Sequence, residues 1–124
     1  MMSLPNRVLV VDDNQDMAKG TAMVLRELPA EVQVAHSADG ACSEMKAGPC
    51  DLVVSDIVMP QMSGIELVER LKRSQPDLRV LLVSGQRSHP SLRDRELPAG
   101  AAFLAKPFTP AALSEKVRDV LDHR

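Results

Sequence analysis

The sequence is poor in aromatic side chains. It contains no Trp and no Tyr among its 124 residues, and its two Phe are Phe103 and Phe108. A core must therefore be built from aliphatic side chains, and few rings are present on which bases could stack. The net charge is −2 and no basic run stands out. Direct binding of DNA or RNA, which usually needs a positive stripe, is not expected.

Long hydrophobic runs and cysteine pairs are also missing. No apolar stretch approaches the ~20 residues of a membrane span. The first seven residues lack the charged-then-apolar layout of a signal peptide, so we expect a cytoplasmic protein. Cys42 and Cys50 form neither a C-x-x-C pair nor a zinc pattern. Two free thiols are the expectation in a reducing cytosol.

The chain contains five short apolar runs, and its length suits one domain. Such runs are typical of strands that are buried on both faces of a sheet. The predicted strands are Arg7–Val11, Val32–Ala35, Leu52–Ser55, Val80–Val83 and Ala101–Ala105.

Stretches of helical period separate these runs. The first, Asn14–Leu28, is predicted to stop before Pro29 and to turn one apolar face inward, made of Met17, Thr21, Val24, Leu25 and Leu28. Three further helices are predicted to begin at Ser37, Ser63 and Thr109, which can cap them. The segment Gln86–Gly100 has few inward apolar residues, so a short or irregular fourth helix is expected.

Five strand–helix pairs in series predict an α/β fold, a (βα)5 doubly wound parallel sheet with helices on both faces. We expect residues 1–124 to form one domain. In such a sheet, ligands bind at the carboxyl ends of the strands. The side chains found there are Asp12, Asp13, Asp56, Ser84 and Lys106.

Carboxylates gathered at one edge of a sheet repel one another, and a divalent cation removes that conflict. Mg²⁺ prefers oxygen ligands and keeps several waters. Asp13 and Asp56, with a backbone carbonyl from the following loop at Val58, would supply a partial shell. Asp12 would bind directly or through water.

A cation and a lysine beside a carboxylate outline a phosphoryl-transfer site. The transferred group carries charge on its oxygens, which needs positive partners placed in advance. Lys106 is one such partner, and the Ser84 hydroxyl can donate a hydrogen bond. Asp56 is then the candidate nucleophile, since a carboxylate can accept a phosphoryl group.

Four motifs resemble those of bacterial two-component receiver domains, in the same order and at similar separations. They are Val8–Asn14, Asp51–Pro60 with Ser63-Gly64 after it, Val83–Gly85 and Phe103–Phe108. The resemblance implies a five-stranded sheet of order 2-1-3-4-5. It also implies a phosphohistidine donor on a sensor histidine kinase or a phosphotransfer protein. The short fourth-helix region is similar to receivers attached to hybrid sensor kinases.

The resemblance further implies roles for single residues. Asp12, Asp13 and Asp56 would bind Mg²⁺, and Asp56 would be phosphorylated. Lys106 would contact the phosphate, and its bond to Pro107 would be cis. Ser84 and Phe103 would form a switch pair, the hydroxyl moving toward the phosphate and the ring turning inward. On this interpretation the protein catalyses its own phosphorylation and dephosphorylation and does not turn over outside substrates.

Several alternatives stay open. A Mg²⁺-dependent phosphohydrolase would need a second carboxylate two residues after Asp56, where Val58 stands. A degenerate interaction module would be expected to lose members of the site. Met17 and Ala18 either fill the core or form part of a docking face for the donor. The chain is expected to be a single-domain regulator or a receiver from a larger protein, and the Met1 start favours the former. The cognate kinase and the output are not specified.

Overall fold

The computed structural model describes residues 6–60, 62–85 and 100–122, which form a parallel sheet flanked by helices. The strand order is β2-β1-β3-β4-β5, which confirms the predicted fold. The strands are β1 (Asn6–Val11), β2 (Ala30–Ala35), β3 (Leu52–Asp56), β4 (Arg79–Ser84) and β5 (Ala102–Ala105). The helices are α1 (Gln15–Leu25), α2 (Ala38–Ala47), α3 (Gly64–Ser74) and α5 (Pro110–Asp122). The predicted fourth helix falls on residues 86–99, which lie outside the described part of the chain.

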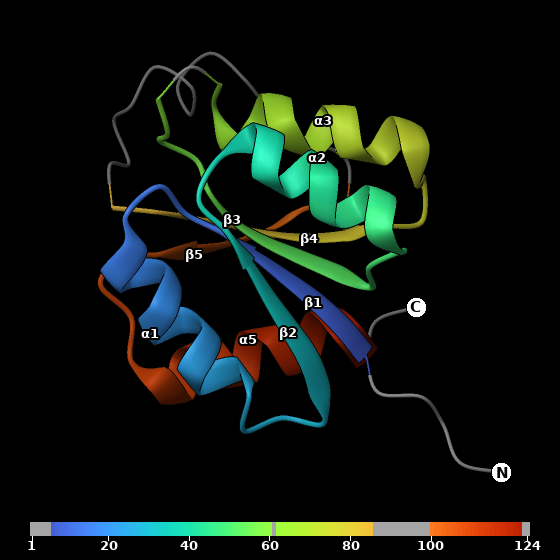
Figure 1. Ribbon diagram of the computed structural model, residues 1–124. Helices are drawn as coiled ribbons and strands as arrows, with labels where there is room; N and C mark the ends of the chain where they lie inside the picture. Colours follow the sequence, from blue (N-terminus) through green and yellow to red (C-terminus); the bar gives the residue numbers. More distant parts are fainter. Residues whose placement is uncertain (1–5, 61, 86–99, 123–124) are drawn as a thin grey trace, which may run out of the picture.

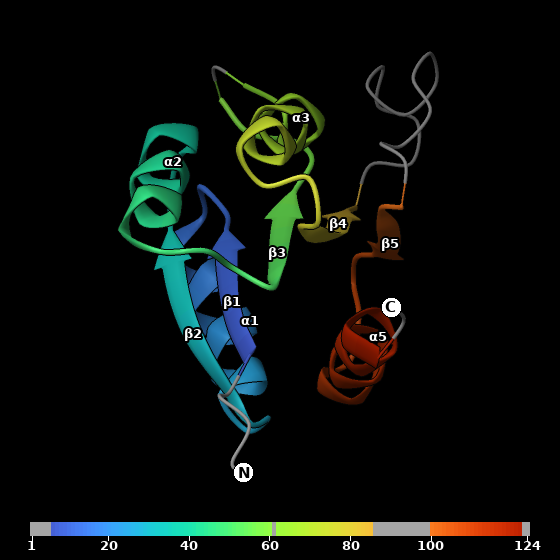
Figure 2. The same ribbon diagram turned by 90° about the vertical axis from the view of Figure 1, so that its right-hand side faces the viewer.

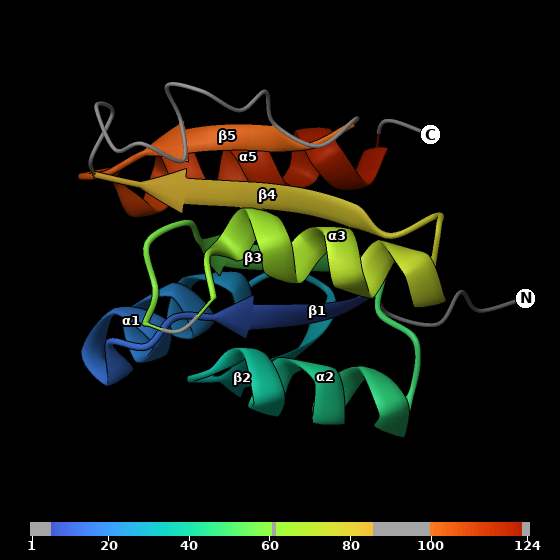
Figure 3. The same ribbon diagram turned by 90° about the horizontal axis from the view of Figure 1, so that it is seen from above.

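The helices cover both faces of the sheet. Figure 1 shows α2 and α3 on one side of the strands and α1 and α5 on the other. Seen from above, the arrows of β1 and β4 point the same way, so their carboxyl ends lie at one edge (Figure 3). Within the described residues, no helix combines the length and the apolar character that crossing a membrane requires.

Two hydrophobic clusters hold these layers together, one on each face of the sheet. On β1, Val8 and Val10 contribute to the cluster beneath α1 and α5, whereas Leu9 and Val11 contribute to the one beneath α2 and α3. This alternation follows from the pleat of a strand. It explains why the strands are continuous apolar runs, because both of their faces are buried.

The inward face of α1 agrees with the prediction only in part, since Leu25 and the following Leu28 are buried as predicted. Its buried residues are Ala18, Ala22 and Leu25, while Met17 is 37% exposed. The predicted inward placement of Met17 was therefore wrong, because the larger apolar residue was assigned to the core in place of the alanines beside it. The fully buried Ala18 cannot belong to a docking face.

The helix starts agree with the caps that the sequence predicts. Ser37 Oγ accepts a hydrogen bond from the Gly40 N–H (3.0 Å), and Ser63 Oγ accepts one from the Glu66 N–H (3.2 Å). Thr109 Oγ1 accepts one from the Ala112 N–H (3.0 Å). Each of these bonds satisfies a backbone donor that has no partner inside the helix.

Candidate functional site

The acidic residues predicted to meet at the sheet edge do so. Asp12 follows β1 directly and Asp56 is the last residue of β3, and these two strands are neighbours whose ends point the same way (Figure 2). One carboxylate oxygen from each of Asp12, Asp13 and Asp56 lies within 4.8 Å of the others. Asp12 is buried and Asp13 exposed, so the cluster is reachable from solvent on one side.

Lys106 joins this cluster from the end of β5. Its Nζ atom lies 3.3 Å from Asp12 Oδ2 and 3.5 Å from Asp56 Oδ2. The Lys106 side chain is 18% exposed, and those of Asp12 and Asp56 are 6% and 13% exposed. Charges this far withdrawn from water interact more strongly than surface ion pairs do. The peptide bond between Lys106 and Pro107 is cis, as predicted.

The backbone of the site is bonded into the sheet beyond the strand ends. The Asp12 N–H donates to the Ala35 carbonyl (3.1 Å), and the Lys106 N–H donates to the Ser84 carbonyl (3.0 Å). The N–H of Ile57, which follows Asp56, donates to the Val83 carbonyl (3.0 Å). The functional side chains therefore start from a fixed backbone.

Burial dominates the electrostatics of Asp56 and raises the pKa of its carboxyl above the ordinary value. Lys106 works against this rise in the pKa, while the negative charge of Asp12 adds to it. The Val58 N–H, which lies 3.4 Å from Asp56 Oδ1, also lowers the pKa. The single lysine thus leaves the negative charge of the cluster incompletely compensated.

This donor set fits a hard divalent cation. The available atoms are carboxylate oxygens, which Mg²⁺ prefers. Asp12 already accepts from the Asn14 N–H at Oδ1 (3.0 Å) and from Lys106 at Oδ2. Asp56 likewise faces the Val58 N–H and Lys106, so the exposed Asp13 is the freest of the three carboxylates. The Val58 carbonyl stays a prediction, since only its N–H is placed relative to Asp56.

Ser84 and Phe103 lie on the same face of the sheet. Ser84 pairs with Ala105 and Leu82 pairs with Phe103, and side chains two residues apart on a strand share a face. Ser84 is buried, and the half-buried Phe103 packs against the cluster under α2 and α3. The two residues that the resemblance pairs as a switch therefore lie on adjacent strands, on the same face of the sheet and two residues apart in register.

Two further residues support the site, and sequence reasoning did not assign either of them this role. Gly64 donates its N–H to the Ile57 carbonyl (2.8 Å), and a Cβ atom at Gly64 would lie 2.1 Å from the Asp56 carbonyl oxygen. His36 Nδ1 lies 3.2 Å from the Asp12 carbonyl oxygen. Only the fold brings His36 to Asp12, because 24 residues separate them along the chain.

The chain resembles known proteins over nearly its whole length. The family model of the response regulator receiver domain matches residues 8–118. The response regulator receiver protein CpdR of Brucella abortus (strain 2308) is 32% identical over 117 residues, which make up 93% of this chain and 96% of CpdR. The sensor kinase CckA of the same organism is 33% identical over 117 residues, and this chain spans 12% of its length.

Solved structures give the same picture. A CheY-like response regulator receiver domain protein from Methanospirillum hungatei JF-1 superposes with a TM-score of 0.82 at 31% identity, covering 95% of this chain and 94% of that one. The receiver domain of the hybrid histidine kinase CckA superposes with a TM-score of 0.77 at 29% identity, covering 94% and 99%.

Proposed function

The chain belongs to the response regulator receiver family, and we propose that it accepts a phosphoryl group from a phosphohistidine on the carboxylate of Asp56. The observation that carries this proposal is the position of Lys106 Nζ within 3.5 Å of both Asp12 and Asp56. A lysine held against two carboxylates at the end of a parallel sheet supplies positive charge where a phosphoryl group would arrive.

In the proposed reaction, an oxygen of Asp56 forms a bond to phosphorus while the bond between phosphorus and the donor's imidazole nitrogen breaks. The electron pair of that bond stays on the donor's ring, and an acyl phosphate forms on Asp56. Lys106 stabilises charge on the phosphoryl oxygens, and the Ser84 hydroxyl donates to one of them. The domain thereby catalyses its own modification. In the proposed reverse step a water attacks phosphorus, the bond between phosphorus and the Asp56 oxygen breaks, and inorganic phosphate leaves the free carboxylate behind.

Magnesium is part of this proposal because a divalent cation would compensate the negative charge of the clustered carboxylates. Asp13 and Asp56 would hold the ion with the Val58 carbonyl, and Asp12 would bind it directly or through water. The ion would supply positive charge to the transferring group beside Lys106. Asp12 already bonds Lys106 and the Asn14 N–H, which suits a contact through water.

Ser84 and Phe103 would transmit the phosphorylation of Asp56 to the surface of the domain. Phosphorylation gives Ser84 and Lys106 a new charged partner, which shifts the population toward an arrangement with the hydroxyl near the phosphate. Phe103 shares the face of Ser84 and is half-buried, so an inward turn of its ring would bury apolar surface that is now exposed. The affected surface would include β5 and α5.

A sensor histidine kinase or a phosphotransfer protein would be the donor, acting in the cytoplasm. The surface beside the acidic cluster suits it, because an apolar groove of about 190 Å³ runs between α1 and α5 there. Met17, Val24 and Phe108 line this groove, and Met17 is exposed. An apolar helix face of the donor could pack against it and present a phosphohistidine to Asp56.

The decisive experiment is intact mass after incubation with acetyl phosphate and Mg²⁺, on the wild type and on Asp56→Asn in parallel. We expect one phosphoryl adduct on the wild type, which is absent without Mg²⁺ and absent from the variant. If folded wild-type protein takes no adduct from acetyl phosphate or from a phosphohistidine donor, the chain is an interaction module that does not use phosphate.

A further inference from the structure

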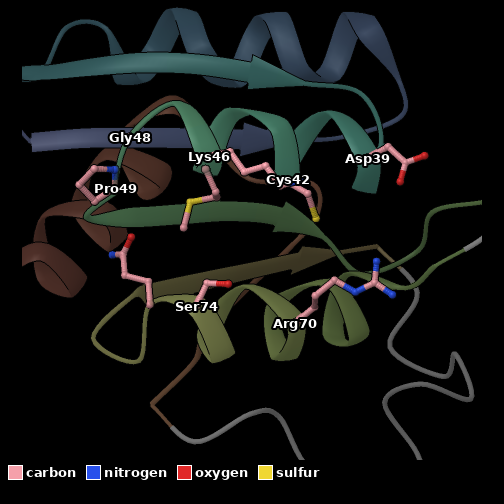
Figure 4. Close-up of a pocket in the computed structure, with 9 residues that line it drawn as sticks. Asp39, Cys42, Lys46, Gly48, Pro49, Arg70 and Ser74 are labelled. Atoms are coloured by element: carbon pink, nitrogen blue, oxygen red, sulfur yellow. The ribbon is translucent and has the colours of Figure 1, made fainter.

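A second cavity lies away from the acidic cluster, between α2 and α3. Its volume is about 690 Å³, within the ~300–1,000 Å³ range of small-molecule sites. Figure 4 shows Cys42 of α2 on one side of this groove and Arg70 and Ser74 of α3 on the facing side. On α2 only the small Ala41 is completely buried, and the larger Cys42 and Met45 remain half-buried at the groove.

Sulfur-containing side chains give the groove its apolar surface. Cys42 and Met45 are both half-buried and pack against the hydrophobic cluster beneath α2 and α3. A thiol and a thioether are soft, polarisable groups that adapt to the shape of an apolar body. This wall therefore favours an aliphatic or aromatic group over a fully polar ligand.

The rims of the groove are positively charged. Lys46 comes from the last turn of α2 and Arg70 from α3, and both are exposed. Neither has a hydrogen bond or an ion pair to another described residue, whereas Lys106 has two carboxylate partners. Asp39, the one acidic residue among the described residues of the lining, lies in the first turn of α2, at the opposite end from Lys46. Two cations against one carboxylate leave the groove with net positive charge.

We propose that the groove between α2 and α3 binds a small organic anion. The apolar body of the ligand would lie on Cys42 and Met45, its carboxylate, sulfonate or phosphate group would pair with Arg70, and Lys46 would add positive charge from the facing helix. An arginine and a lysine are suited to such a group, since the guanidinium offers paired donors and the ammonium a mobile point charge. This site does not depend on phosphorylation of Asp56, so each proposal can fail without the other.

The Cys42 thiol provides a local readout of occupancy. The probe is 1-anilinonaphthalene-8-sulfonate, an aromatic body with one sulfonate, and the measurement is the rate of Cys42 alkylation by iodoacetamide, followed by intact mass and peptide mapping. We expect saturating probe to slow alkylation at least about fivefold. Fluorescence enhancement without protection of Cys42 would place the probe elsewhere and overturn the proposal, as would absence of binding.

Matched variants test the charge requirement. Arg70→Gln should weaken probe binding about fivefold, the size expected for loss of one partly exposed charge pair. Arg73→Gln, an exposed arginine on the same helix that does not line the groove, should leave binding unchanged. N-phenyl-1-naphthylamine, which lacks the sulfonate, should protect Cys42 less well. Equal loss in the two arginine variants, or equal protection by the neutral dye, would overturn the anion site.

Discussion

Lys106 Nζ lies 3.5 Å from Asp56 Oδ2, so the proposed phosphoacceptor is paired with a cation in the unmodified protein. The same nitrogen also contacts Asp12 Oδ2 at 3.3 Å. A phosphoryl group on Asp56 would replace that carboxylate as a partner of Lys106 and would compete for the lysine with Asp12. On the proposed function, Lys106 would therefore both assist the modification and respond to it.

The first prediction concerns Lys106→Ala. We expect this variant to take a phosphoryl adduct more slowly but to lose the shape change, because the lysine that would follow the phosphate is gone. Amide NMR shifts of Phe103 and its neighbours, compared with and without phosphorylation, measure this. Lys19→Ala, an exposed lysine on α1, is the matched control and should switch normally. A normal switch in Lys106→Ala would contradict the proposed role.

The second prediction concerns pH. The pKa of Asp56 is raised by burial, so the folded state holds this proton at pH values where the unfolded state, with a pKa near 3.8, has released it. The free energy of unfolding therefore loses a contribution as pH rises from 3.8 through the raised pKa. In Mg²⁺-free buffer, the wild type should lose stability relative to Asp56→Asn over this range. Denaturation curves at several pH values test it, and a difference that moved the other way would contradict the assignment.

The third prediction concerns Mg²⁺. Added Mg²⁺ should raise the melting temperature of the wild type, since a ligand that binds only the folded state stabilises it. Asp13→Asn should reduce the gain, and each tenfold loss of affinity removes about 1.4 kcal/mol at saturating ion. Asp16→Asn, which changes an exposed carboxylate in the first turn of α1, should keep the full gain. Equal shifts in both variants would argue against Asp13 as a ligand.

The fourth prediction compares two glycines. Gly64→Ala should lower the free energy of unfolding by about 2–3 kcal/mol, because its Cβ would lie 2.1 Å from the Asp56 carbonyl oxygen and the backbone must move. Gly20→Ala in α1 should raise it by about 0.5–1 kcal/mol, since a Cβ there meets nothing within 4 Å. Chemical denaturation of both variants provides the comparison. An unchanged free energy of unfolding in Gly64→Ala would show that the backbone between Asp56 and α3 shifts at little cost.

The sequence predicted the sheet and its acidic edge because both depend on short-range patterns. Continuous apolar runs mark strands that are buried on both faces, and the residue after such a run must lie at the strand end. The residues of α1 that pack against the sheet could not be predicted so well, because the sequence pattern allowed either Met17 or the smaller Ala18 to point inward. The approach of His36 to Asp12 and the close packing of Gly64 on Asp56 depend on tertiary structure. No local pattern records them.

The hydrogen bonds that continue the sheet through Asp12, Ile57 and Lys106 have a consequence for exchange with solvent. These amides are bonded between neighbouring strands, so their exchange requires at least a local separation of the strand ends. We therefore expect these three amides to exchange more slowly than amides in the loops around the site. A fast response to a partner would then come from side chains and loops around the site, while the backbone at these strand ends keeps its position.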